Sequence, residues 1–227
     1  MDAIQDKRGK IMSDQTAAYL KQPVRTAATL NTLEMVSGVL LILFMWSHMI
    51  LVASVNLGPG VMNAIARFLE DSYLAQAGGP LIAAVFLIHF LLAARNVPFR
   101  SDEQAVLWRH GRRLQHLDTW LWVVQVATGM TILLMACIHM WTVLTDLPIT
   151  AAKSAARIQG GWWLAFYIIL LPLVELHVGI GFYRIGVKWG WITRAKRSFF
   201  KRFENRLTIF FIAIGVITLY VFYRLKI

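Results

Sequence analysis

The amino-acid sequence predicts an all-α protein, an integral membrane bundle of five transmembrane helices with the N-terminus in the cytoplasm and the C-terminus outside. Hydrophobic residues make up 58% of the 227 residues and charged residues only 15%, whereas roughly a quarter of the residues in a soluble domain are charged. Five apolar stretches reach the length of about 20 residues that a helix needs to cross a bilayer. An uneven distribution of lysine and arginine along the chain predicts the orientation.

The five expected helices leave no room for a separate soluble domain. Residues 1–30 form a charged cytoplasmic leader, which argues against a signal peptide, and Met12 is a second candidate for the start of translation. Because the loops are short, a site for polar metabolites has to lie on a partner protein. The membrane domain covers residues 31–225, and its helices are expected at 31–55, 78–98, 118–145, 162–187 and 207–225.

Lysine and arginine favour one side of the expected membrane. Of the 23 residues of these two types, 18 lie in the leader, in residues 95–113 or in residues 184–206. The positive-inside rule assigns the side that these regions share to the cytoplasm. A net charge of +11 would also suit nucleic-acid binding, but the division by membrane side makes topology the better explanation. We therefore expect a lipid bilayer and no nucleic acid as partner.

Four of the six histidines lie inside the expected helices, one in each of the first four: His48, His89, His139 and His177. An ionisable group at membrane depth is costly and marks a functional candidate. A single such histidine could equally form a hydrogen bond between helices, but four of them need a common explanation. Neutral imidazole is a good axial ligand for iron, and a bundle core suits a cofactor. The single cysteine excludes an iron–sulfur centre held by this chain alone and the thioether attachment of c-type haem.

The rise of the α-helix sorts these histidines into two pairs. At 1.5 Å per residue from the cytoplasmic helix ends, His48 lies about 26 Å and His139 about 31 Å deep, whereas His89 and His177 lie about 14 and 15 Å deep. His48 and His139 form the outer pair, and His89 and His177 form the inner pair. A separation of roughly 15 Å between the two levels suits two haems stacked across a membrane.

Two short features support haem binding. Gly38 and Gly129 each stand ten residues before an outer histidine, in Ser37-Gly38 and Thr128-Gly129. A missing side chain at the inner level would admit a flat macrocycle, although small residues also serve ordinary helix packing in membranes. On the fourth helix, Arg184 and Lys188 share the face of His177. They could neutralise haem propionates or simply anchor the helix at the cytoplasmic surface.

The chain resembles the five-helix, dihaem cytochrome b subunit of succinate:quinone oxidoreductases, in particular the menaquinol:fumarate reductase type. The resemblance extends from about Leu30 to Tyr223. Shorter matches surround His48 and His89 and open the third helix at Asp118-Thr119. The strongest stretch comprises Val174-Glu175-Leu176-His177, Gly181-Phe182-Tyr183-Arg184 and Val187-Lys188-Trp189-Gly190-Trp191.

The resemblance implies two b-type haems, ligated by the outer and inner histidine pairs, with Arg157 beside the outer haem and Lys188 beside the inner one. It implies a flavoprotein subunit and an iron–sulfur subunit on the cytoplasmic side, the dicarboxylate site being on a partner chain. Menaquinol is the implied substrate, oxidised near the outer face, with electrons passing through both haems. The family's quinol-site glutamate matches Glu70, but the local spacing leaves Asp71 as an alternative.

Glu175 is a third acidic candidate. It lies about 18 Å from the cytoplasmic end of its helix and, two residues from His177, off the ligand face. A carboxyl group in hydrocarbon tends to be protonated. It could relay protons, as the family's corresponding glutamate is implicated in doing, or only hydrogen-bond a neighbouring helix.

Several alternatives remain open at this point. The same parts could run in reverse as a succinate dehydrogenase anchor, or belong to a cytochrome b anchor of a hydrogenase or formate dehydrogenase. A histidine-based transporter or proton channel without haem is a further alternative. The expected location is the bacterial cytoplasmic membrane, and a dimer of the whole complex is left open.

Overall fold

The computed structural model describes the backbone of residues 2–226 and the side chains of residues 25–113 and 115–226. The two candidate start residues, Met1 and Met12, therefore lie outside the described side chains. Within residues 2–226 all regular secondary structure is helical, and five helices are long and apolar enough to cross a membrane. The predicted all-α bundle of five spans is confirmed. The five long helices are α1 (Asp2–Ala53), α3 (Leu74–Ala94), α5 (Leu117–Leu144), α7 (Trp162–Lys188) and α8 (Arg197–Arg224).

The helices differ from the expected spans at three places. The helix expected at 78–98 is α3, which begins earlier, at Leu74, and ends earlier, at Ala94. The leader and the first span form one continuous helix, α1, and α8 begins at Arg197, well before residue 207. Hydropathy marks the part of a helix that sits in hydrocarbon, whereas the helix itself continues until a residue breaks it. The breaks are visible in the backbone: Gly58, Tyr73 and Gly161 have positive φ angles of 128°, 58° and 79°.

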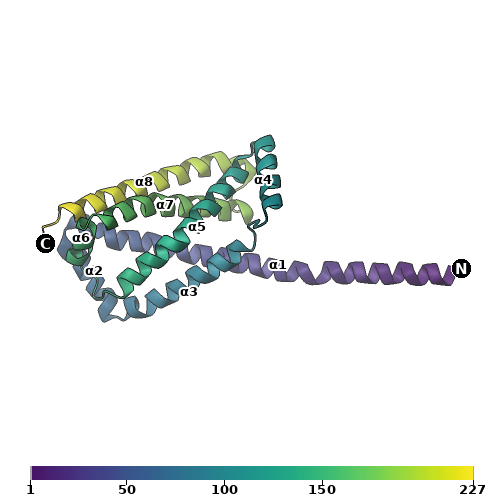
Figure 1. The fold of residues 1–227 in the computed structure, drawn as a ribbon, viewed down its shortest axis with the longest axis horizontal. Coiled ribbons are helices and arrows are strands. Elements are labelled where there is room, and N and C mark those ends of the chain that lie inside the picture. The colour runs from purple at the N-terminus through teal and green to yellow at the C-terminus, as the bar shows by residue number, and fades with distance from the viewer. Residues whose placement is uncertain (1, 227) are drawn as a thin grey trace.

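Three shorter helices occupy the two ends of the bundle (Figure 1). α2 (Pro59–Asp71) and α6 (Ala151–Gln159) lie with the C-terminus at one end, which we call the α6 end. α4 (Ser101–Leu114) lies at the opposite end, the α4 end, and the first part of α1 projects beyond it. α4 has acidic residues in its first turn and arginines in its last, a distribution that the helix dipole favours.

Glycines allow α7 and α8 to approach each other closely. A Cβ atom on Gly215 of α8 would lie 2.5 Å from Leu171 Cδ1 of α7. A Cβ atom on Gly179 of α7 would clash with Thr208 and Glu204 of α8. Small residues at such contacts are typical of membrane helices, because close packing replaces the hydrophobic driving force.

The outer surface of the bundle is apolar. α3 has no buried residue at all, and its side chains Leu81 and Leu91 are 63% and 68% exposed. A helix of this kind is stable only where lipid covers it. Buried apolar side chains form two clusters. At the α6 end, Val55, Met62 and Phe222 pack against α6, and a second cluster, which includes Leu121, Tyr183 and Ile192, joins α5, α7 and the loop after α7.

Candidate functional site

A cavity of about 1060 Å³ runs through the bundle and is lined by all four membrane histidines. Its volume exceeds the roughly 300–1,000 Å³ of most small-ligand sites. Glu34 and Lys188 line it near the α4 end, and Lys153 and Arg157 line it at the α6 end. The space between these ends is mostly apolar, so the cavity suits a large, flat, apolar ligand whose charged groups reach an end.

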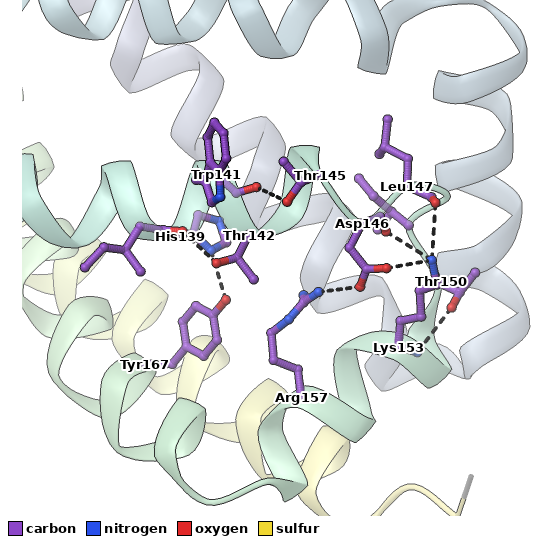
Figure 2. A network of polar contacts seen from close by, with 12 residues as sticks. His139, Trp141, Thr142, Thr145, Asp146, Leu147, Thr150, Lys153, Arg157 and Tyr167 are labelled. Atoms are coloured by element: carbon purple, nitrogen blue, oxygen red, sulfur yellow. Dashed lines mark hydrogen bonds and ion pairs between the residues drawn. The ribbon is translucent and has the colours of Figure 1, made fainter.

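His48 and His139 face each other across the cavity. Their ring centroids are 5.9 Å apart and their planes make an angle of 68°. The Nδ1 atom of His139 lies 2.9 Å from the Tyr167 hydroxyl of α7, as Figure 2 shows. No hydrogen bond to His48 is found among the described side chains. The outer pair thus comes from α1 and α5, and one of its two rings is oriented by a third helix.

His89 and His177 each have a hydroxyl partner on a neighbouring helix. Nδ1 of His89 lies 3.0 Å from Ser37 Oγ of α1, and Nδ1 of His177 lies 3.0 Å from Thr128 Oγ1 of α5. Ser37 precedes His48 by eleven residues and Thr128 precedes His139 by eleven, a rise of about 16 Å along a helix. The four histidines therefore occupy two levels of the bundle.

The two predicted glycines lie directly against the inner histidines. A Cβ atom on Gly38 would be 3.1 Å from His89 Cε1, and one on Gly129 would be 2.9 Å from His177 Cε1. Each glycine thus makes room for an imidazole of the adjacent helix. Both residues also line the cavity.

Charged residues form a network at the α6 end (Figure 2). Asp146 accepts hydrogen bonds from Lys153 Nζ at 3.0 Å and from Arg157 Nη2 at 2.9 Å. The hydrogen bond from Lys153 and the positive charges of both cations lower the pKa of Asp146 from its ordinary value. Arg157 is 14% exposed and lines the cavity, so its guanidinium is held at the cavity edge.

The α4 end of the cavity carries a smaller cluster around Glu34. Its Oε2 atom lies 3.3 Å from Arg95 Nη2 and accepts a 3.1 Å hydrogen bond from Asn96. Lys188 Nζ lies 4.0 Å from the same oxygen. Lys188 is half exposed and therefore free to reach an anionic group in the cavity.

Glu175 lines the cavity and is only 4% exposed. None of the hydrogen bonds or ion pairs found among the described side chains involves its carboxyl group. A buried carboxyl without a partner is costly and points to a functional or transient role.

Glu70 and Asp71 end α2 and do not line the cavity. Glu70 Oε1 accepts a 2.5 Å hydrogen bond from the backbone N–H of Ile149, so this carboxyl holds the loop before α6. Asp71 is exposed. Leu69, which precedes Glu70, and its partner Ile149 do line the cavity, which places Glu70 beside the cavity wall at the α6 end.

Four functional candidates were missed in the sequence. Tyr167, Ser37 and Thr128 contact histidines, and Asp146 holds the cations at the α6 end. The repeated Ser/Thr-Gly dipeptide was a usable signal for Ser37 and Thr128. Nothing in the sequence indicates Tyr167, because its role depends on how α5 and α7 are rotated.

The donor set suits haem iron better than a bare metal ion. No group of three or more His, Cys, Asp or Glu side chains able to hold a metal ion occurs in the described part of the chain. Two histidines suffice where a porphyrin fills the other coordination positions of the iron. The imidazole pairs, the apolar walls and the cations at both ends all fit that group.

The chain is similar to known membrane subunits of respiratory enzymes. The family described as "Succinate dehydrogenase/Fumarate reductase transmembrane subunit" matches residues 101–222. A fumarate reductase cytochrome b subunit from Helicobacter pylori (strain J99) is 34% identical over 201 residues, which cover 84% of this chain and 78% of the relative. The protein of the same description from Wolinella succinogenes is 31% identical over 207 residues, covering 86% and 81%. The chain therefore belongs to the family of succinate dehydrogenase/fumarate reductase transmembrane subunits.

Proposed function

We propose that the chain is the membrane-anchor cytochrome b subunit of a quinol:fumarate reductase in a bacterial cytoplasmic membrane. The names of its relatives, each a fumarate reductase cytochrome b subunit, support this assignment. Its partners are a flavoprotein subunit and an iron–sulfur subunit, and the dicarboxylate site lies on a partner chain. The anchor oxidises menaquinol at one membrane face and delivers the electrons to the iron–sulfur partner at the other.

The observation that carries the proposal is the arrangement of two histidine pairs along one apolar cavity. His48 with His139, and His89 with His177, hold two haems b at the outer and inner levels. Bound there, each haem iron supplies a one-electron carrier. The chain contributes ligation, a dry environment and positive charge: Arg157 and Lys188 line opposite ends of the cavity and can neutralise propionates.

The cytoplasmic side is the α4 end. Most of the 23 lysines and arginines lie in the leader, in and around α4, and between α7 and the apolar part of α8. The positive-inside rule supports a cytoplasmic location for these regions. The iron–sulfur and flavoprotein partners then dock at the α4 end, next to the inner pair.

The menaquinol site lies at the α6 end, close to the outer pair. Its wall includes Leu69 and Ile149, beside the carboxyl groups of Glu70 and Asp71. A carboxylate at this position can accept a proton as a quinol is oxidised and release it outside. Glu70 is the first candidate because its oxygen reaches the cavity wall, and Asp71 is the second.

Glu175 relays protons between the two halves of the bundle. Its burial, its place on the cavity wall and its lack of a described partner support this role. Protons moving inward through Glu175 would offset the charge that electrons carry to the cytoplasmic side. A purely structural carboxyl would be expected to have a fixed hydrogen-bond partner.

Succinate oxidation, the reverse reaction, uses the same residues and is the second candidate direction. A hydrogenase or formate dehydrogenase anchor is disfavoured by the family match, and a transporter without haem by the relatives' names. The test is to co-express the chain with its two partners and purify the complex. We expect two low-spin bis-histidine haems per chain and quinol-dependent fumarate reduction; a complex without haem would overturn the proposal.

A further inference from the structure

The Ser37 and Thr128 hydroxyl groups lie within hydrogen-bond distance of backbone carbonyls on their own helices. Ser37 Oγ donates a 3.0 Å hydrogen bond to the Glu34 carbonyl of its own helix. Thr128 Oγ1 donates to the carbonyls of Val124 at 2.8 Å and Gln125 at 3.1 Å. A hydroxyl has one proton and two lone pairs. When that proton points to a backbone carbonyl, each oxygen presents a lone pair to the neighbouring imidazole and acts as an acceptor.

This arrangement favours one tautomer of both inner histidines. In that tautomer, Nδ1 of His89 and Nδ1 of His177 carry the protons that the two hydroxyl oxygens accept. Nε2 of each ring is then left with a free lone pair beside the cavity. The opposite tautomer would leave an unpaired N–H donor against apolar walls, which is unfavourable. The rings are thus held in the form that can bind iron through Nε2.

The glycine after each hydroxyl residue completes the contact. With a Cβ atom at Gly38 or Gly129, the imidazole Cε1 atom would be only 3.1 or 2.9 Å away. Cε1 lies between the two ring nitrogens, so displacing it would move Nδ1 and Nε2 together. In each dipeptide, the Ser or Thr hydroxyl therefore positions the imidazole ring through Nδ1, and the following glycine leaves room for its Cε1 atom.

The two contacts are equivalent parts of a repeat. α1 carries the outer ligand His48 and holds His89 of α3; α5 carries the outer ligand His139 and holds His177 of α7. The spacing from hydroxyl to outer ligand is the same on both helices. We propose that Ser37-Gly38 and Thr128-Gly129 are matched positioning elements that set the tautomer, orientation and basicity of the inner haem's two ligands. This inference rests on the proposed dihaem function.

The test compares Ser37→Ala and Thr128→Ala in the purified complex. Loss of an acceptor from Nδ1–H makes a ligand less basic, which favours ferrous iron. The midpoint potential of the inner haem should rise, and its retention should fall by about 10- to 100-fold, the range typical of lost outer-shell partners. The outer haem should keep its potential. Thr128→Ser retains the hydroxyl and should restore the wild-type inner potential.

Matched controls exist on the same helices. Thr32 and Thr131 donate hydrogen bonds to the Ala28 and Ala127 carbonyls, and neither has a hydrogen bond to a histidine among the described side chains. Thr32→Ala and Thr131→Ala should leave both potentials unchanged. Gly129→Ala keeps the hydroxyl but crowds His177, and should alter the low-spin electron paramagnetic resonance signal of the inner haem alone.

The failures of the two proposals can be told apart. Two bis-histidine haems with an unshifted inner potential in both alanine variants would overturn this inference and leave the dihaem function standing. Equal shifts in the Thr32→Ala and Thr131→Ala controls would also overturn it, because helix perturbation would then explain the effect. A wild-type complex without bis-histidine haem would overturn both.

Discussion

The Tyr167 hydroxyl lies 2.9 Å from Nδ1 of His139, and the two rings meet edge to face with their centroids 5.5 Å apart. This contact joins α7 to α5 at the level of the outer histidine pair. His48, the other member of that pair, stacks on Phe44, with ring centroids 5.7 Å apart, and has no described hydrogen bond. One histidine of the outer pair is thus held by a polar contact and the other by apolar packing.

Tyr167→Phe should affect the outer haem alone. The ring remains and its packing with it, but the hydroxyl that pairs with His139 Nδ1 is lost; with Nε2 on iron, Nδ1–H would donate to that oxygen. We expect both haems to be retained and the midpoint potential of the outer haem to rise, since a ligand without its hydrogen-bond acceptor is a weaker donor. Redox titration of the Soret and α bands measures this. Tyr220→Phe, at a position 63% exposed on α8, is the matched control, and an equal shift in that variant would contradict the assignment.

Single histidine substitutions should remove one haem each. His48→Ala or His139→Ala should abolish the outer haem and spare the inner one, and His89→Ala or His177→Ala should do the reverse. Haem quantification per chain should fall from two to one in purified complexes that still contain both partners. A high-spin, single-ligand spectrum in wild type, or loss of both haems from every variant with intact helices, would refute the pairing.

Asp146→Asn should weaken the α6 end in a pH-dependent way. The hydrogen bond from Lys153 lowers the pKa of Asp146 in the folded protein, so its ionised form stabilises the fold above the ordinary value of 3.8. That contribution is lost as the pH falls through the lowered pKa. Wild type should therefore melt above the variant at pH 7, with the difference shrinking below pH 3.8. Melting in detergent across this range checks it.

Asp102→Asn is the control for that experiment, because the Arg100–Asp102 pair is also at the surface, with side chains 74% and 65% exposed. An isolated exposed pair contributes little stability, so we expect a smaller difference from wild type than in Asp146→Asn, limited to the interaction of Asp102 with the helix dipole. A constant gap between wild type and Asp146→Asn at all pH values would mean that the effect does not come from the charge of Asp146.

Glu70→Gln separates proton transfer from loop anchoring. The glutamine carbonyl can still accept the Ile149 N–H hydrogen bond, but it cannot take up a proton. We expect quinol oxidation to fall by about 10²-fold or more, in line with loss of a general base. Haem content and fumarate reduction with an artificial donor should be unchanged. Full quinol activity in both Glu70→Gln and Asp71→Asn would place the quinol site elsewhere.

Glu175→Gln tests the proposed relay. The amide keeps the size of the side chain in its buried position but cannot carry a proton. Both haems should stay bound while quinol-dependent turnover in sealed vesicles collapses. Near-normal turnover would show that the carboxyl serves packing. Adding an uncoupler to the vesicles is the internal control for effects of the membrane potential.

Residue counting along the helices was sufficient for the depth of each histidine. Hydropathy locates the spans because only uninterrupted apolar helices satisfy their backbone groups in lipid. The fixed rise per residue then places His48 with His139 and His89 with His177 at two levels. The same arithmetic marked Gly38 and Gly129 as lying at the inner level. All of these predictions concern the position of a residue along its helix axis, that is, its depth in the membrane.

The structure was needed for everything that depends on rotation about those axes. Whether Tyr167 or another residue of α7 reaches His139 depends on side-chain packing between helices, which no single-helix count contains. The helices α2 and α6 are too short and polar to give a membrane signal, so the partner of Glu70 and the Asp146 network could not be anticipated. Gly38 and Gly129 show the division clearly: their level follows from the helical rise, but their contact with an imidazole follows only from the way that neighbouring helices pack.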